Sequence, residues 1–236
     1  MNLKQNNVNC KNCSLDNICF PRGLSQEEIN SINQIIRPKQ TLHRGEYIFR
    51  GGETFKGVLA IKSGTAKQVS NDFDGNEHIL NILLPGELLG FDGFINNKYH
   101  YSAIALETLS YCVLPAQSMD DIFYKVPTLS KELFRHSCER INDYKEFYVL
   151  GKRPAEERLA HFLISLSDRL KKRGFSASKF TLSLTRQEMG NHLGLALETI
   201  SRLLKKFQQE DLISCKSKHI EILDIPRLRA IFTYTE

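Results

Sequence analysis

The sequence predicts an α+β fold, in which a domain of short antiparallel strands is followed by a long helix and then by a small, mainly helical domain. Three observations support this prediction. Turn signals recur about every eleven residues between residues 44 and 114, a spacing typical of short antiparallel strands. A long helical pattern covers residues 127–150, and two short helical runs joined by a glycine cover residues 184–207.

Length and composition fit two modest domains of an ordinary globular protein. The chain has 236 residues, of which 41% are hydrophobic and 25% charged. Lys and Arg number 16 against 17 Asp and Glu in residues 1–150, but 16 against 10 in residues 151–236. The basic excess therefore lies wholly in the second part, as expected for a domain that contacts phosphate groups.

The N-terminal ten residues, MNLKQNNVNC, are polar and contain no apolar stretch that would serve as a signal peptide. No run approaches the length of a membrane span either. We therefore expect a cytoplasmic protein. In that reducing compartment the six cysteines are expected to bind metal or to stay as buried thiols rather than to form disulfides.

Three of these cysteines lie close together near the N-terminus. Cys10, Cys13 and Cys19 form a C-x2-C-x5-C pattern in a segment with few other core-forming residues. Thiolates this close repel one another unless a metal or cluster neutralises them. Zinc sites and cubane iron–sulfur clusters usually take four protein ligands. The fourth ligand must then come from elsewhere in the chain.

The predicted strands point to a candidate for that fourth ligand. Their boundaries are set by the turn signals Gly51-Gly52, Ser63-Gly64, Asp74-Gly75 and Pro85-Gly86. This pattern predicts an antiparallel β-sandwich, barrel or roll. In the last strand Leu109, Tyr111 and Val113 share one face, so Cys112 points away from the sheet core and is available to a metal. Cys138 and Cys215 are expected to be apolar fillers.

The long helical pattern ends at Gly151, which is expected to cap the helix, and carries two stripes at helical spacing. The first stripe consists of Leu129, Leu133, His136, Arg140, Asp143, Phe147 and Leu150, and the second of Phe134, Cys138, Ile141 and Tyr148. A helix with two such stripes can pack on its own β-domain with one and on a second copy of the chain with the other. The alternative is a single helix buried within one chain.

The first stripe also suggests a switch residue. If it forms the seam of a dimer, Asp143 approaches the Asp143 of the second copy, and the two like charges repel. Arg140 is expected to offset part of this repulsion by pairing across the seam. We therefore predict that Asp143→Ala dimerises and binds DNA even in air.

Residues 152–236 have the pattern of a winged helix-turn-helix. Leu159, Phe162, Leu163, Leu166 and Leu170 predict a supporting helix. Thr185 and Glu188 form a capping box, Gly194 ends the helix that follows, and a second amphipathic helix runs to Phe207. Residues 213–222 predict a hairpin whose turn is Lys216-Ser217-Lys218, which would be the wing. The alternative is an ordinary surface pair of helices.

The second of these helices would lie in the major groove of DNA. Glu198, Ser201 and Arg202 stand at i, i+3 and i+4 and project from one face near its start. Arg can bind guanine O6 and N7 with two hydrogen bonds, Glu can accept from cytosine N4, and Ser can bond to several bases. The alternative for Arg202 is a phosphate contact.

A β-domain, a dimer helix and a winged helix-turn-helix, in that order, resemble the regulator superfamily of the cyclic AMP receptor protein over nearly the whole chain. Four cysteines at 10, 13, 19 and 112, with LETISR at 197–202, resemble its oxygen-sensing branch, the fumarate and nitrate reduction regulators (FNR). The resemblance implies a cyclic-nucleotide-binding-like β-roll. It also implies a 4Fe-4S cluster on the four cysteines, which oxygen converts to a 2Fe-2S form and then destroys, weakening the dimer and DNA binding.

The same resemblance implies a homodimer that binds palindromic DNA with TTGAT-type half-sites, and RNA polymerase as a partner. It divides the chain into a cluster-binding segment at 1–22, a β-roll at 23–126, a dimerisation helix at 127–151 and a DNA-binding domain at 152–236. Ser14, Leu15, Ile18 and Phe20 are plausible neighbours that would shield the cluster.

Several alternatives differ from this reading. Spacing alone leaves zinc open as the metal. The Pro85–Gly90 stretch resembles a cyclic-nucleotide cassette, but no arginine lies between Arg50 and Arg135 to bind the phosphate, so we expect no cyclic nucleotide.

Two further functions are possible alternatives: a regulator that senses another small ligand, and an iron–sulfur electron carrier. Seven histidines are scattered singly, which argues against haem. No catalytic constellation occurs, so no enzyme is expected.

Overall fold

The computed structural model describes residues 10–38 and 41–232. These form two compact units, of which the first reaches Ile141 and the second begins at Asn142. The elements in chain order are η1 (Cys10–Asn12), α1 (Gln26–Asn33), β1 (Arg37–Pro38), β2 (Tyr47–Phe49), β3 (Gly57–Ser63), β4 (Ala66–Asn71), β5 (Glu77–Leu83), β6 (Leu88–Leu89), η2 (Phe91–Phe94), β7 (Ser102–Ala105), β8 (Ser110–Pro115), η3 (Ala116–Ser118), α2 (Met119–Lys125), α3 (Pro127–Leu150), α4 (Ala155–Lys171), β9 (Lys179–Thr181), α5 (Arg186–Leu193), α6 (Leu197–Gln209), β10 (Ile213–Lys216), β11 (His219–Ile222) and α7 (Ile225–Ala230).

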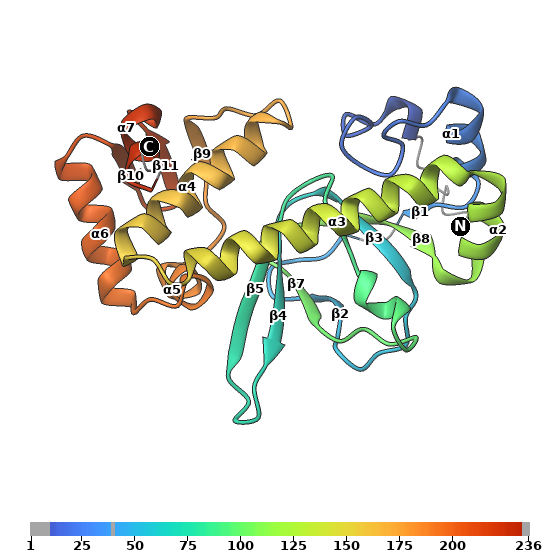
Figure 1. Ribbon diagram of the computed structural model, residues 1–236, viewed down its shortest axis with the longest axis horizontal. Coiled ribbons are helices and arrows are strands. Elements are labelled where there is room, and N and C mark those ends of the chain that lie inside the picture. The colour runs from blue at the N-terminus through green and yellow to red at the C-terminus, as the bar shows by residue number, and fades with distance from the viewer. Residues whose placement is uncertain (1–9, 39–40, 233–236) are drawn as a thin grey trace, which may run out of the picture. The chain divides into compact units, whose positions relative to one another are not determined.

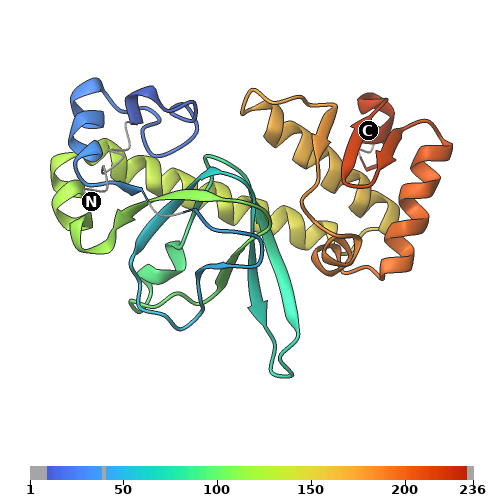
Figure 2. The same ribbon diagram turned by 180° about the vertical axis from the view of Figure 1, so that it is seen from behind.

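The first unit is built on two antiparallel four-stranded sheets, shown in Figures 1 and 2. One sheet has the strand order β1-β8-β3-β6 and the other β2-β7-β4-β5. Apolar side chains from both sheets share one core, which includes Phe49, Leu59, Ala103 and Leu114. The predicted α+β fold with an N-terminal antiparallel β-domain is therefore confirmed.

Residues from the N-terminal segment and from the helices after β8 extend this core. Phe20, Ile32 and Ile36 belong to it, as do Ile122 on α2 and Leu129 on α3. Burying these side chains fixes the N-terminal segment against the sheets through the hydrophobic effect, at about 25 cal/mol per Å² of apolar surface. The cysteine segment is thus part of the folded unit and not a free arm.

Helix α3 has the predicted bounds, because it runs from Pro127 to Leu150. Gly151 follows it but is not among the glycines with positive φ, so the expected left-handed cap does not form. Instead Gly151 N–H donates to the carbonyl of Phe147, and Arg153 N–H donates to that of Leu150. None of the helices in the described ranges combines the length and hydropathy needed to cross a lipid bilayer.

The second unit is a winged helix-turn-helix. Thr185 Oγ1 accepts from Glu188 N–H at 3.1 Å and Glu188 Oε2 accepts from Thr185 N–H at 2.8 Å, which is the predicted capping box. Gly194 ends α5 at φ 63° and ψ 42°. The predicted hairpin is β10 and β11, and a strand that the sequence did not predict, β9, pairs with β11 to complete a three-stranded sheet.

Candidate functional site

The three N-terminal cysteines lie in a segment of consecutive tight turns. Cys13 N–H donates to the carbonyl of Cys10 at 3.3 Å, and Cys19 N–H donates to that of Leu15 at 2.9 Å. Cys10 N–H donates to the side-chain oxygen of Asn33, the last residue of α1, at 2.8 Å. The last of these hydrogen bonds joins the segment to α1, and Leu15 in the segment is buried.

The fourth cysteine, Cys112, lies in the middle of β8. It stands opposite Ala60 on β3 and Pro38 on β1, so it is on an inner strand of its sheet. Its side chain is only 8% exposed, and it belongs to the same hydrophobic core as Cys10 and Phe20. The face of β8 that carries Cys112 is therefore covered by the rest of the unit.

The four thiols lie close enough to influence one another electrostatically. The pKa of Cys10 is raised to about 12, mainly by burial and also by the charges of Cys112 and Cys13, while Lys62 lowers it. Burial also raises the pKa of Cys19, and the charges of Cys112, Cys10 and Cys13 contribute to the increase. The pKa of Cys112 rises to about 11, mainly through burial, while Lys62 lowers it and Cys13 raises it. Every pair among the four cysteines is thus coupled.

In the described part of the chain, no three His, Cys, Asp or Glu side chains lie close enough together to hold a metal ion as they stand. The donor set nevertheless suits a multi-iron cluster or a single zinc ion. Cys10, Cys19 and Cys112, whose pKa values are raised, stay protonated unless cations replace their protons. A cationic centre among the thiols would offset both the desolvation penalty and the mutual repulsion of the thiolates.

The other two cysteines lie apart from this region. Cys138 is exposed on α3, and Cys215 is half-buried in β10, where its thiol is 3.8 Å from the carbonyl of Ser217. Neither is a cause of the pKa shifts of Cys10, Cys19 and Cys112.

The second candidate site is the outer face of α6. Its inner face is buried through Ile200, Leu203, Leu204 and Phe207. Glu198 and Arg202 are exposed on the opposite side, and Ser201 between them is half-buried. Two charged side chains and a hydroxyl thus share one accessible face, with the geometry that readout of base edges requires.

Two contacts of α6 were not predicted from the sequence. Arg186, the first residue of α5, donates to the Ser201 hydroxyl at 3.3 Å. Lys206 pairs with the carboxylate of Glu156 on α4 at 2.6 and 2.7 Å, which raises the pKa of the lysine. Both partners are distant in sequence, so no local pattern could have shown them.

The turn between α5 and α6 depends on two further residues that sequence reasoning missed. A Cβ on Gly190 would lie 2.5 Å from the carbonyl oxygen of Leu195, so only glycine allows the two helices to approach this closely. Arg158 on α4 donates to the carbonyl of Leu193 at 2.8 Å and satisfies the end of α5. Gly190, a glycine inside a short helix, was the one sequence signal that could have indicated this close approach.

The stretch that resembles a nucleotide cassette already contains an anion of its own. Asp92 Oδ2 accepts from the backbone N–H groups of His100 and Tyr101 at 2.6 and 3.3 Å. These two backbone donors, which follow the Pro85–Gly90 stretch in the chain, are therefore used by an internal carboxylate.

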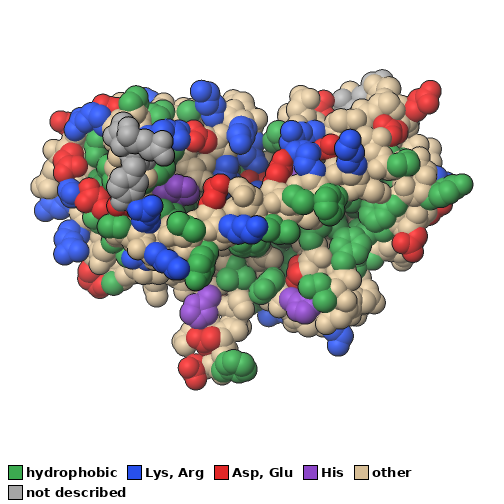
Figure 3. Space-filling model, in the orientation of Figure 1, with side chains coloured by type: hydrophobic (Ala, Val, Ile, Leu, Met, Phe, Trp, Pro, Cys, Tyr) green, Lys and Arg blue, Asp and Glu red, His purple; other side chains and the backbone are tan. Residues whose placement is uncertain are grey.

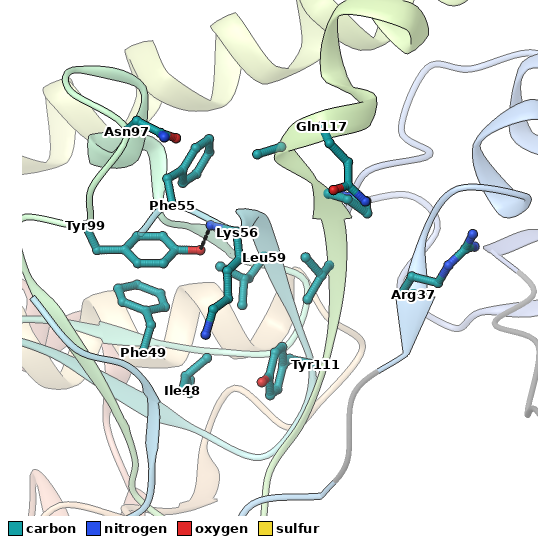
Figure 4. Close-up of a pocket in the computed structure, with 13 residues that line it drawn as sticks. Arg37, Ile48, Phe49, Phe55, Lys56, Leu59, Asn97, Tyr99, Tyr111 and Gln117 are labelled. Atoms are coloured by element: carbon teal, nitrogen blue, oxygen red, sulfur yellow. Dashed lines mark hydrogen bonds between the residues drawn. The ribbon is translucent and has the colours of Figure 1, made fainter. Parts of the chain in front are cut away.

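A cavity of about 740 Å³ opens in the β-domain, and no cysteine is among the residues that line it. Figure 4 shows the rings of Phe49, Phe55 and Tyr99 on one side of it and Arg37 well away from them. The Tyr99 hydroxyl accepts from Lys56 N–H at 3.2 Å and donates to the carbonyl of Gly57 at 2.9 Å. The Tyr99 hydroxyl, the polar group on this side of the cavity, thus already has both a hydrogen-bond donor and an acceptor.

The fold and the exposed face of α6 define a DNA-binding transcription regulator with a β-roll domain. Residues 39–125 match the cyclic nucleotide-binding domain, and residues 157–231 match the Crp-like helix-turn-helix domain. The structure of FixK2 from Bradyrhizobium japonicum superimposes with a TM-score of 0.77 at 21% identity, covering 86% of this chain and all of that one.

The curated relatives narrow the class. The transcriptional activator Anr of Pseudomonas protegens is 40% identical over 96% of this chain and 93% of its own. The fumarate and nitrate reduction regulatory protein of Vibrio cholerae is 39% identical over 92% of this chain and 87% of its own. The chain belongs to the FNR branch of the CRP/FNR family of transcription regulators. It is a regulator and not an enzyme.

Proposed function

We propose that the chain is an oxygen-responsive transcription regulator whose signal is a 4Fe-4S cluster held by Cys10, Cys13, Cys19 and Cys112. The observation that carries this proposal is that these four thiols, and neither Cys138 nor Cys215, act on one another electrostatically, with Cys10 and Cys112 in one hydrophobic core and Cys19 packed against it. When bound, the cluster would supply the oxygen-reactive chemistry. The protein supplies the thiolates and the apolar cover of Leu15 and Phe20.

Metal analysis of protein purified without oxygen tests this proposal. We expect iron and acid-labile sulfide in nearly equal amounts, a brown colour with broad visible absorption, and bleaching on exposure to air. A colourless protein with one zinc ion per chain would show that the same thiols form a zinc site instead.

We further propose that the regulator acts as a homodimer through α3. Leu129 and Leu133 of the first stripe are buried in the β-domain core, whereas Phe134 and Tyr148 of the second stripe are 72% and 68% exposed. Figure 3 shows hydrophobic side chains gathered along α3 on one face. An exposed apolar stripe on a long helix is what a coiled-coil partner would cover.

The predicted switch residues lie near the middle of this helix. Arg140 pairs with Glu87 of its own chain at 3.9 Å, whereas the sequence had suggested a partner across the seam. Asp143 is exposed. Asp143→Ala therefore distinguishes two arrangements of the dimer. Sedimentation in air should find a dimer if Asp143 faces its symmetry mate, and a wild-type monomer–dimer balance if the second stripe alone forms the seam.

For DNA we propose that two copies of α6 bind palindromic TTGAT-type half-sites through Glu198, Ser201 and Arg202, and that the bound dimer contacts RNA polymerase. Two recognition helices related by a twofold axis require a palindromic operator. We propose no cyclic nucleotide as effector, because Asp92 already uses the backbone donors of His100 and Tyr101.

The aromatic cavity supports a second candidate function, in which the same regulator senses a small apolar ligand. The colour of protein purified without oxygen distinguishes the cluster-based function from the ligand-sensing one. A colourless, iron-free protein that binds its operator tightly without oxygen would favour the ligand-sensing function and overturn the cluster.

A further inference from the structure

The turn between β5 and β6 lies against the cysteine segment. Gly86, in this turn, has φ +85°, and a Cβ placed on it would lie 2.8 Å from side-chain carbons of Ile18. Ile18 directly precedes Cys19 in the chain. The positive φ favours glycine and a side chain here would have to displace Ile18, so the cysteine segment packs directly on the backbone of this turn.

The turn is held rigidly to its neighbours by hydrogen bonds. Gly86 N–H donates to the carbonyl of Ile61 at 2.7 Å, and Ile61 N–H donates to the carbonyl of Glu87 at 3.1 Å. The Glu87 carboxylate in turn accepts from Leu84 N–H at 3.2 Å. A displacement of Ile18 is therefore transmitted to Glu87 and is not absorbed in a loose loop.

Glu87 connects this turn to α3. Its side chain is 7% exposed, and Oε2 lies 3.9 Å from a guanidinium nitrogen of Arg140, which is 24% exposed. A buried carboxylate is stable only with compensating partners, and removing one from a buried pair is costly. The separation is at the outer limit of an ion pair, so a shift of the turn away from α3 would break this pair.

A second link between the N-terminal segment and α3 is more exposed. Arg22, whose N–H donates to the carbonyl of Cys19, lies 4.0 Å from Glu139 on α3. Both side chains are nearly half exposed, at 45% and 47%. Solvent screens such a pair strongly, so it contributes little. The buried link through Glu87 is the stronger of the two.

We propose that Glu87 and Arg140 are positioning residues that couple the cysteine segment to α3. Ile18 presses on Gly86, Gly86 fixes Glu87, and Glu87 holds Arg140 in the middle of the helix on which the proposed dimer depends. Movement of Cys19 toward the other thiols when a cluster binds then changes the position of α3. This inference rests on the proposed function, because it assumes a cluster on the four cysteines and a dimer through α3.

The test compares Glu87→Gln with the wild type and with Asp121→Asn, in full-length chains purified without oxygen. Asp121 pairs with Lys125 on the surface of α2 at 2.9 Å, so its change removes an equivalent charge far from the turn. Iron and sulfide content reports cluster binding, and sedimentation reports the dimer dissociation constant with and without cluster.

We expect Glu87→Gln to bind as much iron as the wild type. The ratio of the dissociation constants without and with cluster should fall by about tenfold or more, equivalent to ~1.4 kcal/mol of lost coupling. Asp121→Asn should keep the wild-type ratio. An iron-loaded Glu87→Gln with the wild-type ratio would overturn the coupling, whereas an iron-free wild type would overturn the proposed function itself.

Arg140→Gln is the second variant, and it carries the test alone if Glu87→Gln does not fold. The two residues act as a pair if the double variant loses no more coupling than either single variant. Losses that simply add would show that Glu87 and Arg140 act independently, which contradicts the proposed link.

Discussion

The two candidate sites of this protein are built in opposite ways. Glu198, Ser201 and Arg202 come from a little more than one turn of a single helix, and their outer surface is open to solvent. The four cysteines come from an N-terminal segment and from β8, and Cys10 and Cys112 are buried in a core. The DNA-facing site comes from neighbouring residues and is exposed to solvent. The cysteine site is assembled from segments that are distant in sequence, and two of its thiols are buried.

The difference follows from what each site would bind. DNA bases and phosphates are polar groups that must be reached from solvent, so a recognition surface needs exposed side chains on a rigid support. A redox-labile cluster depends on protection from water and on tuned electrostatics, so its ligands must be buried. Substitutions should therefore be able to disturb cluster binding without disturbing DNA recognition, and the reverse.

The largest effect is expected from Cys112→Ser. Serine cannot replace a thiolate ligand of iron, so we predict loss of nearly all iron and sulfide from protein purified without oxygen, with thermal unfolding of the DNA-binding unit unchanged. Metal analysis and calorimetry measure the two results. Cys138→Ser, at the exposed cysteine of α3, is the matched control and should keep its full iron content.

A core substitution in the second unit should destabilise that unit and leave cluster binding unchanged. Phe207 is fully buried behind the recognition helix, so Phe207→Ala is expected to destabilise that unit by about 3–5 kcal/mol. Denaturant unfolding followed by circular dichroism measures the loss, and iron content should remain at the wild-type level. If the cluster were lost as well, the two units would not be independent. Lys205→Ala, on the exposed side of the same helix, serves as the control.

Arg202→Ala tests reading without disturbing the fold. Loss of two hydrogen bonds to guanine should cost roughly 1–3 kcal/mol on the cognate operator and relax specificity at one G·C position. Fluorescence anisotropy on the cognate operator and on operators with that pair changed measures both effects. An equal loss on all sequences would reassign Arg202 to the DNA backbone.

The smallest effect concerns acid stability, since each unit contains a half-buried histidine. Burial lowers the pKa of His136 on α3 and of His161 on α4 below the ordinary 6.5. Nearby acidic groups, Glu139 and Glu146 respectively, oppose this shift only in part. Each histidine therefore contributes stability that is complete above pH 6.5 and is lost as pH falls through the lowered pKa.

Replacing His161 by Gln should flatten the pH dependence of unfolding of the second unit and leave that of the first unchanged. Unfolding midpoints measured between pH 5 and pH 7.5 provide the comparison. A variant in which both transitions flatten together would show that the units titrate as one body.

Much of the second unit was predictable because its signals are local. The Thr185–Glu188 capping box, the Gly194 stop and the hairpin around Ser217 each involve residues within a few positions of one another. Strand β9 was missed because three residues are too few for an alternating pattern to be recognised, and the strand forms through pairing with β11. The support of α5 by Arg158 was also missed, since its partner lies 35 residues away.

The sequence by itself determined the order of the domains, the bounds of α3 and the face of α6 that can meet DNA, because helical periodicity and capping are properties of neighbouring residues. Only the tertiary structure decided that Cys10, Cys19 and Cys112 lie in or against one hydrophobic core, and that Glu87 meets Arg140. Those contacts arise when apolar surfaces of distant segments are removed from water together, and no pattern along the chain records which surfaces will meet.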